Sequence, residues 1–426
     1  MPERVVVTGM GVIAPGASGV PEFEVALREG RSGIRFWPEA AELGLGCQVG
    51  GIPAIDSKLL DDLLPPPRRR VLSPIMEYAA LAAIECWRDS GLPFDFEPSG
   101  RVDWDTGCVV GTGIGAIDIL TGVVAPLVAQ RQHRKMGSRM VERVMISGSS
   151  ASVAGILGLG GPAITVSSAC SSATCAIHRA AQTVRMGLCK RILAGGVEIP
   201  SLHTAATFDS MHVVPRDFNQ EPEKASRPLS ATAGGFVPSG GSGFLMLEAL
   251  ESARERDARI YAELAGSYEN SGGQRGDGSM TAASSEGAIR CIRGATADAG
   301  VPSADIDYVN GHLTGTTGDP REIQHLATAL GRRLTELPWV NATKSLTGHA
   351  LGAAGAIESI ATVLQLNGGF LHPSANCRDL HPEIEDIAGR VPMRTVPCQF
   401  NIALKTSFGF GDVNACLIFR RYEANH

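Results

Sequence analysis

Short apolar runs alternate with helix-like segments along most of the 426 residues, and this alternation constrains the fold more than any other feature of the sequence. Buried parallel strands read as near-continuous apolar runs, and strands that alternate with helices form largely parallel sheets covered on both faces. We therefore predict an α/β fold. The predicted strands are residues 4–13, 105–116, 163–166, 190–198, 243–250, 260–268, 306–312, 337–343, 400–410 and 415–421, and the predicted helices include 76–87, 287–299 and 352–367.

The alternation runs through the chain twice, with a seam near residues 248–262. No sequence repeat accompanies it, so the order of the elements alone indicates a duplication. We predict two halves, residues 1–253 and 254–426. Functional groups in such sheets gather at the carboxyl ends of the strands, so residues directly after strands are the first candidates for a site.

Charge and composition argue against several classes of protein. The 38 basic and 44 acidic residues give a net charge of −6, which offers no general basis for binding nucleic acid. No apolar run reaches the roughly 20 residues of a membrane helix, and the charged start is not typical of a signal peptide, so we expect a cytoplasmic protein. The ten cysteines are scattered without CxxC spacing. This favours reduced thiols over a disulfide framework, and we expect no metal site.

The segment 165–187, TVSSACSSATCAIHRAAQTVRMG, holds a candidate nucleophile. Cys170 follows a strand and a serine-rich turn and stands where a helix begins. Free backbone N–H groups and the helix dipole at such a position favour the thiolate, and the same amides can stabilise an oxyanion. A buried structural cysteine is the alternative, because free cysteines are usually core residues. Cys175 and His178 fall inside the helix, and we interpret both as packing or surface residues.

Two histidines and a lysine downstream also follow predicted strands. His312 lies in YVNGHLTGTTGDPRE, and Lys344 and His349 lie in WVNATKSLTGHALGAAGAIES. With Cys170 they suit carbon–carbon bond formation on thioesters: the cysteine carries an acyl group, and two imidazoles donate hydrogen bonds to a thioester oxygen as it becomes an enolate. A cysteine hydrolase is the competing interpretation, but it leaves the second histidine and the lysine without a role.

At these residues the sequence resembles the β-ketoacyl-acyl carrier protein synthases, nearest the type II elongating condensing enzymes. The resemblance covers nearly the whole chain and is carried by the combined order of VVVTGMGVIAPGAS, GTGIG, SSACSS, ILAGGVE, KASRP, NATKSLTGHALGAAGAIES and SFGFGDVN. It implies the thiolase fold, with two similar βαβαβαββ halves in a five-layered α-β-α-β-α core. It also implies that Cys170 accepts an acyl chain from a carrier protein, and that malonyl carrier protein loses carbon dioxide and extends this chain by two carbons.

The resemblance also implies roles for individual residues. His312 and His349 would support decarboxylation and condensation, and Lys344 would position and polarise them. Glu322 is implied as the ion partner of Lys344, and Glu358 as a structural carboxylate. The amides of Cys170 and Phe410 would form the oxyanion hole, and the Phe410 side chain would gate the acyl pocket with Phe408 beside it. Thr314 and Thr316 would bind the phosphopantetheine arm. Ile114 would line the acyl tunnel. Core packing is the alternative for both phenylalanines.

The implied partner is an acidic acyl carrier protein, which brings the phosphopantetheine arm, so we expect no cofactor of the chain's own. The docking surface should be basic despite the negative total charge. The candidates are PPPRRR, with Arg68, Arg69 and Arg70, and RQHRKMGSR, with Arg131, Arg134, Lys135 and Arg139. A solvated charged run is the alternative for any one of them. The chain would form a homodimer, or a heterodimer with a related chain-length partner.

Three departures from the family pattern favour a specialised pathway, such as a type II polyketide or polyene system, over general fatty acid synthesis. Leu313 stands where a glycine usually follows the first histidine, which predicts a narrower malonyl approach or a shifted loop. Asp412 and Val413 alter the glycine-rich segment and put a carboxylate near the gate. Ala233 and Gly234 stand where charged residues, including a docking arginine, are frequent.

Two alternatives to a condensing enzyme stay open. One is a non-catalytic subunit that determines chain length by shaping the tunnel of a partner, although all four catalytic side chains are present. The other is a thiolase-like enzyme acting on acyl coenzyme A, which would need a second cysteine in the final strand region. There the nearest thiol is Cys416, past the FGFGD segment.

Overall fold

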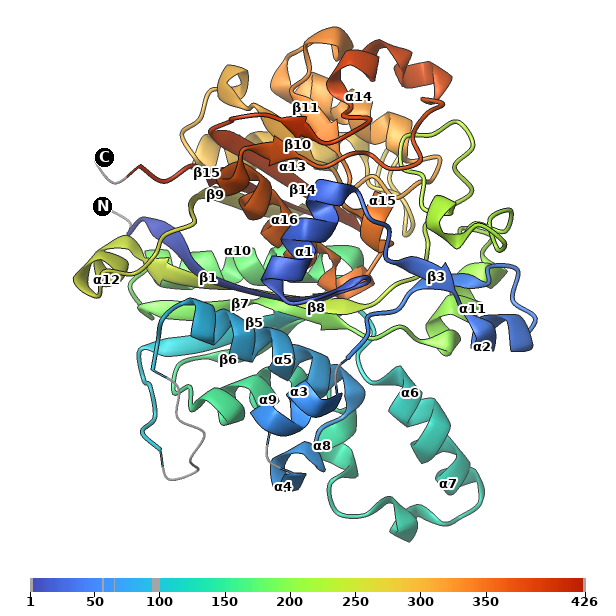
Figure 1. Ribbon diagram of the computed structural model, residues 1–426, viewed down its shortest axis with the longest axis vertical. Helices are drawn as coiled ribbons and strands as arrows, with labels where there is room; N and C mark the ends of the chain where they lie inside the picture. The colour runs from blue at the N-terminus through green and yellow to red at the C-terminus, as the bar shows by residue number, and fades with distance from the viewer. Residues whose placement is uncertain (1–2, 56, 65, 94–99, 424–426) are drawn as a thin grey trace.

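The computed structural model describes residues 3–55, 57–64, 66–93 and 100–423, without the side chains of 57–59, 67 and 68. Its centre is an eleven-stranded sheet, including the short β2 (Ala17–Ser18), whose strands lie in two layers in Figure 1. One layer contains, in spatial order, β1 (Val5–Ala14), β8 (Gly241–Ala249), β7 (Arg191–Glu198), β5 (Thr106–Gly111) and β6 (Ala163–Val166). The other contains β9 (Ala262–Ser271), β15 (Val413–Arg420), β14 (Ile402–Gly409), β10 (Tyr308–Asn310) and β11 (Trp339–Asn341).

The two layers have the same strand order and the same strand directions. Each begins with two antiparallel pairings and continues with two parallel ones. A short antiparallel pairing of β1 with β9, at Val6–Glu263 and Val7–Ala262, joins them. The predicted duplicated α/β fold is therefore confirmed. The boundary after residue 253 falls inside α12 (Leu250–Glu255) and stays a prediction.

Helices complete five layers. Between the two sheet layers lie α10 (Ser172–Arg185) and α16 (Ala354–Gly368), and Figure 1 shows both in the middle of the molecule. All residues of α16 from Ala354 to Leu366 are buried, including the polar residues Glu358, Ser359, Thr362 and Gln365, as expected for a helix enclosed between two sheet layers. The outer faces are covered by α5 (Pro74–Asp89) and α9 (Gly148–Leu157) on one side, and by α13 (Ser285–Asp298) and α14 (Asp319–Leu330) on the other.

The two central helices begin in the same way. A 3-10 turn, η3 (Ala169–Ser171), leads into α10, and a second one, η7 (Leu351–Ala353), leads into α16. Each turn opens with a non-glycine residue in the left-handed region, Ala169 at φ 51° and Leu351 at φ 45°. Such residues are uncommon and accompany sharp changes of chain direction. Both turns follow a parallel strand end, so they bring two loops to one edge of the core.

Shorter elements surround these layers. The helical ones are α1 (Val20–Glu29), α2 (Pro38–Glu42), α3 (Ser57–Leu63), α4 (Pro66–Arg69), α6 (Ile117–Ile119), η1 (Leu120–Val124), α7 (Ala125–Ala129), η2 (His133–Met136), α8 (Met140–Val144), α11 (Leu202–Ser210), η4 (Pro222–Lys224), η5 (Ser303–Asp305), η6 (Leu334–Glu336), α15 (Lys344–Thr347) and η8 (Pro382–Arg390). The others are two antiparallel two-stranded sheets, β3 (Ile34–Phe36) with β4 (Val49–Gly51) and β12 (Phe370–Leu371) with β13 (Val396–Pro397). No helix in the described part of the chain is long and apolar enough to span a bilayer.

The predicted strands and helices are all present, with shifted ends. The predicted strand 306–312, for example, shortens to β10, because the chain turns into the His312 loop after Asn310. Three helices of ten or more residues, α1, α9 and α14, were not among the predictions. α14 carries a recognisable start, with Asp319 in its first turn and Pro320 at one of its first two positions.

Candidate active site

Serine side chains build the turn that presents Cys170. The Ser171 hydroxyl donates to the carbonyl of Ser168 (2.7 Å), and the Ser172 hydroxyl donates to the carbonyl of Ala169 (2.6 Å). The Ser172 oxygen also accepts the Ser168 amide (2.9 Å). These bonds hold the left-handed turn in place, so that Cys170 stands between β6 and α10 as predicted. Cys175 and His178 lie inside α10 and are buried there.

Strand β14 passes very close to this turn. A Cβ atom on Gly409 would lie 2.7 Å from the carbonyl oxygen of Ser168 and 2.9 Å from the Ser171 hydroxyl. Only glycine tolerates such an approach. As a result the next residue, Phe410, brings its amide to the Cys170 sulfur, and the amide of Cys170 also acts on that sulfur. These are the two amides predicted for the oxyanion hole.

The thiol of Cys170 is more basic than the sequence predicts. Burial raises its pKa to about 11, and the charge of Lys344 and the Phe410 amide oppose this only in part. The expected preference for the thiolate is therefore wrong for the free protein. Desolvation of the sulfur outweighs the amides at the helix start.

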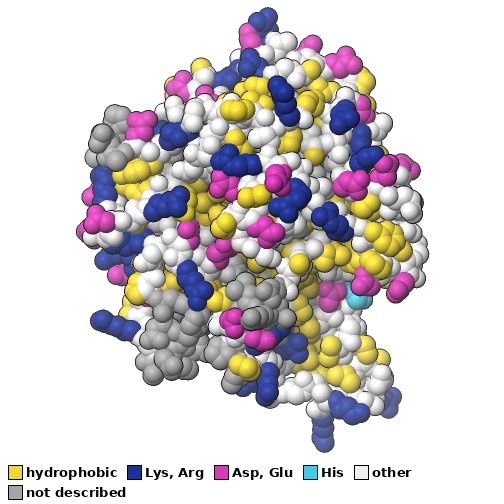
Figure 2. Space-filling model, viewed as in Figure 1, with side chains coloured by type: hydrophobic (Ala, Val, Ile, Leu, Met, Phe, Trp, Pro, Cys, Tyr) yellow, Lys and Arg dark blue, Asp and Glu magenta, His cyan; other side chains and the backbone are white. Residues whose placement is uncertain are grey.

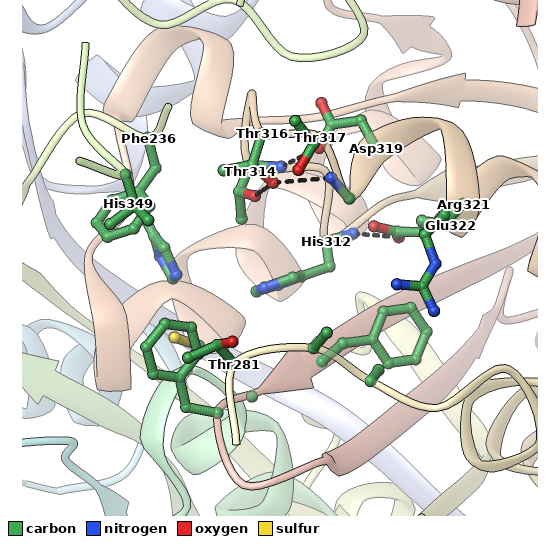
Figure 3. A pocket seen from close by; sticks show the side chains of 18 of the residues that line it. Phe236, Thr281, His312, Thr314, Thr316, Thr317, Asp319, Arg321, Glu322 and His349 are labelled. Carbon is green, nitrogen blue, oxygen red and sulfur yellow. Dashed lines mark hydrogen bonds between the residues drawn. The ribbon is translucent and has the colours of Figure 1, made fainter. Parts of the chain in front are cut away.

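His312 and His349 face one another in the same pocket. Their ring centroids are 5.4 Å apart, with the planes nearly perpendicular, and Figure 3 shows both rings pointing into one space. The Nδ1 of His349 accepts the amide of Leu351 (3.2 Å), and the Nδ1 of His312 lies 3.5 Å from the ammonium of Lys344. Each Nδ1 thus serves as an acceptor, which assigns the ring proton to Nε2. Burial and the Lys344 charge keep the pKa of both imidazoles well below the usual value.

Lys344 pairs with Glu358, not with Glu322 as the resemblance implied. Its ammonium is hydrogen-bonded to the Glu358 carboxylate and donates to the carbonyl of His312 (2.6 Å). Glu358 projects from the central helix α16 on the side where Lys344 lies. Glu322 belongs to the outer helix α14, and it accepts the amides of His312 (2.7 Å) and Leu313 (2.8 Å). Glu322 therefore shapes the His312 loop, and burial raises its pKa to about 7.

A second buried lysine, Lys405, was missed by the sequence reasoning. Its ammonium lies 2.8 Å from the second oxygen of Glu358 and 3.0 Å from the Ser407 hydroxyl. Lys405 is the only charged residue in the apolar segment 400–410. A lone charge inside a buried strand needs a partner, and this signal could have identified it.

The pocket formed by these groups has a volume of about 560 Å³. Its lining includes eight residues singled out from the sequence: Cys170, His312, Thr314, Thr316, Glu322, His349, Phe408 and Phe410. Thr314 and Thr316 join their hydroxyls at 3.0 Å, as drawn in Figure 3. Phe408 packs edge-on to the His312 ring at 6.2 Å.

Ile114 is absent from the described lining of this pocket. It lies in the loop after β5, with 39% of its surface exposed. The buried carboxylate of Glu198 holds this loop through the amides of Gly113 (2.6 Å), Ile114 (3.3 Å) and Gly115 (3.3 Å). The backbone of the loop is therefore held in place, and the role of Ile114 in an acyl tunnel stays a prediction.

Comparison with known families identifies the chain. Residues 2–253 match the model of the β-ketoacyl synthase N-terminal domain, and residues 261–378 match that of the β-ketoacyl synthase C-terminal domain. The chain belongs to the β-ketoacyl synthase family.

Individual relatives agree along the whole length of this β-ketoacyl synthase. It is 35% identical to 3-oxoacyl-[acyl-carrier-protein] synthase 1 of Haemophilus influenzae, over 99% of each chain. It is also similar to the solved structure of the ishigamide ketosynthase/chain length factor, with 28% identity and a TM-score of 0.88 over 99% of this chain and 100% of that one. A third similarity is to a type II PKS acyl-carrier protein in complex with its ketosynthase bound to the hexaketide, with 27% identity and a TM-score of 0.85 over the same shares.

Two of the departures from the family pattern have clear positions. Leu313 is fully buried in the core on the outer side of β10, near Gly311. It does not line the described pocket, because its side chain packs in the outer core, and this contradicts the narrower malonyl approach. The alternative, a shifted loop, stays a prediction. Ala233 is half-buried and Gly234 is exposed.

Asp412 connects the gate to a neighbouring loop. Its carboxylate is fully buried at a φ of 60°, and it accepts the amides of Gln274 (3.0 Å) and Ser284 (2.9 Å). The amide of Gly411 donates to the carbonyl of Met280 (2.7 Å). Residues 272–284, which include pocket-lining residues 281–283, are thus tied to the segment that carries Phe410.

We expect Asp412→Gly to release this loop. Glycine accepts the positive φ, but the variant loses hydrogen bonds to a charged acceptor worth about 1.5–3 kcal/mol each. Hydrogen–deuterium exchange of the Gln274 and Ser284 amides should accelerate about 10- to 100-fold. Asp257→Gly is the matched control, since Asp257 also has a positive φ (52°) but lies in the turn after α12. Unchanged exchange in residues 272–284 of the Asp412 variant would contradict this role.

The two basic segments, residues 68–70 and 131–139, differ in how their charges are paired. Arg69 is paired with Asp61 and lies 3.6 Å from Glu77, while Arg70 is exposed, and the side chain of Arg68 is outside the described part of the structure. In the second segment all four basic residues are exposed and make no ion pair with any described residue: Arg131, Arg134, Lys135 and Arg139. Figure 2 shows Lys and Arg side chains at the tip of the projection that α6 and α7 form in Figure 1.

Proposed function

We propose that the chain is a 3-oxoacyl-acyl carrier protein synthase, which extends a Cys170-bound acyl chain by decarboxylative condensation with malonyl carrier protein. The observation that carries the proposal is the convergence of Cys170, His312 and His349 on one pocket, with an Nε2 proton on each imidazole. The names of the similar proteins support it. A hydrolase would leave one of the two imidazoles unused.

The first half-reaction transfers the acyl chain to the enzyme. The Cys170 sulfur attacks the thioester carbonyl, and the amides of Cys170 and Phe410 stabilise the oxyanion. When the tetrahedral intermediate collapses, the bond to the phosphopantetheine sulfur breaks, and the proton of the Cys170 thiol ends on the departing thiol. Proton loss must accompany attack, because the thiol is protonated in the free protein at neutral pH.

The second half-reaction forms the carbon–carbon bond. The two Nε2–H groups donate to the thioester oxygen of the malonyl group, and carbon dioxide leaves as that oxygen gains negative charge. The enolate carbon then attacks the acyl carbonyl on Cys170, and the carbon–sulfur bond breaks to give the 3-oxoacyl product and a thiolate that takes up a proton. Burial lowers the pKa of His312 and His349, and Lys344 adds to this effect, so both imidazoles stay neutral hydrogen-bond donors in this step.

The substrates would arrive on an acyl carrier protein. The paired hydroxyls of Thr314 and Thr316 would bind the amide groups of the phosphopantetheine arm, and the chain would need no cofactor of its own. The unpaired cations of the segment 131–139 suit an acidic carrier, and such docking weakens as salt is added. The protein would act in the cytoplasm.

A second, related chain would complete the assembly. β6 is an edge strand, and Ile164 on it is 50% exposed. Further exposed apolar residues belong to the neighbouring segment: Leu120, Val128, Val141, Met145 and Ile146. An open apolar edge favours pairing with another sheet. We propose a dimer across β6, with Ile114 lining the acyl tunnel beside the partner; the solved ketosynthase/chain length factor makes a heterodimer a second candidate.

The test is a reconstitution with purified carrier proteins. The protein, an acyl carrier protein thioester and malonyl carrier protein should yield a 3-oxoacyl carrier protein, detected by intact mass. Replacing both carriers with coenzyme A thioesters tests the thiolase-like alternative, which is disfavoured because Cys416 is buried within the core rather than in the described pocket lining. No carbon dioxide release by the chain alone would favour the non-catalytic subunit. Comparing saturated with unsaturated or oxo-acyl primers separates fatty acid from polyketide roles.

A further inference from the structure

Lys405 is a buried charge that the reaction described above does not use. It lies on β14, its side chain is fully buried, and its ammonium contacts the carboxylate of Glu358, the hydroxyl of Ser407 and the carbonyl of Thr406. An ammonium group removed from water is costly unless it is paired and hydrogen-bonded. Three acceptor groups therefore compensate for the burial of this one ammonium group.

Two ammonium groups share one carboxylate at the back of the pocket. Lys344 is paired with one oxygen of Glu358, and Lys405 is paired with the other. All three side chains are at most 2% exposed. The cluster thus holds one positive charge more than a Lys344–Glu358 pair would hold alone. Glu322 also faces Lys405, but burial raises its pKa to about 7, so it neutralises the excess only in part near neutral pH.

This excess charge lies next to the groups that handle the malonyl thioester. Lys344 reaches the carbonyl of His312, and the Ser407 hydroxyl that Lys405 contacts lies 2.7 Å from Thr174 of the nucleophile helix. The charge of Lys405 also contributes to the lowered pKa of both His312 and His349. Lys405 does not rank among the charges that act on Cys170.

We propose that Lys405 is a positioning residue for the condensation step: it fixes Glu358 and Lys344 behind the two imidazoles and gives the buried wall a net positive charge that favours the enolate. The proposal rests on the proposed function. In the decarboxylation step, negative charge moves onto an oxygen that only the imidazoles contact. A fixed positive charge in a water-excluded site stabilises that oxygen more strongly than it would in water.

The titratable groups around Lys405 determine how the pH dependence of decarboxylation should respond when the Lys405 charge is removed. Those that face Lys405 or the two imidazoles are Lys344, Glu358, Glu322, His312 and His349, with Tyr308 beside Glu358. Removing the Lys405 charge raises the pKa of His312 and His349. As the pH falls, the two imidazoles then become protonated at a higher pH than in the wild type. The acidic limb of the pH profile for decarboxylation therefore shifts to higher pH.

The experiment measures carbon dioxide release from malonyl carrier protein and acyl transfer to Cys170 separately, across pH, for the full-length protein. We expect Lys405→Met to lower kcat for carbon dioxide release about 10- to 100-fold, to move its acidic limb to higher pH, and to change acyl transfer less than about threefold. Lys405→Arg should restore the limb. Lys190→Met is the matched control, because Lys190 is exposed and pairs only with Asp105 among the described residues.

Each outcome bears on one proposal. If the wild-type protein releases no carbon dioxide, the proposed function fails whatever the variants do. If it does, and Lys405→Met keeps the wild-type rate and acidic limb, the role of Lys405 is overturned. Equal losses in acyl transfer and carbon dioxide release would also overturn it, because they would indicate a general loss of structure. Lys405→Gln, which keeps a hydrogen-bond donor, replaces the Met variant should that variant not fold.

Discussion

Cys170→Ala abolishes formation of the acyl-enzyme and lowers 3-oxoacyl production by about a thousandfold or more. Among the described residues, no other thiol lines the pocket, so no group can replace the lost nucleophile. Carbon dioxide release from malonyl carrier protein should persist, because His312, His349 and Lys344 come from the other half of the sheet and are untouched. Intact mass after incubation with an acyl carrier protein checks the first result, and trapped carbon dioxide checks the second.

Cys175→Ala is the control for this variant. Cys175 lies in the same helix and is also buried, but it does not line the pocket. It should retain acyl transfer. An acyl adduct on the Cys170→Ala protein would contradict the assignment of the nucleophile.

The pH dependence of alkylation offers an independent check of Cys170. Because burial raises the thiol pKa to about 11, iodoacetamide labelling of the free wild-type protein should climb about tenfold per pH unit between pH 7 and 10. A rate that levels off near pH 8 would show that the thiolate is already favoured in the free protein.

Glu358→Gln has the largest expected effect on stability. The substitution keeps the shape of the side chain but removes the carboxylate that pairs with both buried ammonium groups, those of Lys344 and Lys405. Breaking a buried pair by removing one partner costs about 3–5 kcal/mol. Denaturant unfolding monitored by circular dichroism should show this loss in the free energy of unfolding at pH 7. Glu286→Gln is the control, because the Glu286–Arg290 pair is exposed and its loss should leave the free energy of unfolding almost unchanged.

The loss should shrink as the pH rises. Burial already lowers the pKa of Lys405, and removing Glu358 lowers it further. The unfolded state, with an ordinary lysine pKa near 10.4, then binds more protons than the folded state, so the stability of the variant rises with pH relative to the wild type. A deficit that is the same at pH 7 and pH 9.5 would mean that the lysine charges are not its cause.

The sequence predicted those parts of the molecule that depend on order along the chain. Apolar runs alternating with helices determine the two sheet layers, and because strand ends converge, Cys170, His312, Lys344 and His349 could be placed together before any distance was known. The parts that were missed depend on contacts through space. The sequence does not show whether Glu322 or Glu358 pairs with Lys344. The positions of their helices decide it, because Glu358 lies on the central helix α16 and Glu322 lies on the outer helix α14.

Burial explains the other differences. The pKa of Cys170 follows from how completely its surroundings exclude water, which no local motif reports. Leu313 was expected to narrow the malonyl approach or to shift the loop, but its side chain packs in the outer core, away from the described pocket lining. Lys405 could have been identified from the sequence, because it is a charged residue inside an apolar strand segment. Its burial in β14 means that it needs a partner of opposite charge.

The matching starts of the two central helices have a consequence for the history of the site. Cys170 stands in the turn before α10, and His349 lies two residues before the turn that leads into α16. A duplicated ancestor would have placed two copies of one turn face to face across the seam. The present chain has kept the backbone shape of both turns, but its catalytic side chains occupy different positions relative to them. Cys170 is the second residue of its turn, where the other turn has Gly352, and His349 lies three residues before Gly352. One repeated backbone shape thus presents a thiol from within the turn in one half and an imidazole from the approach to the turn in the other.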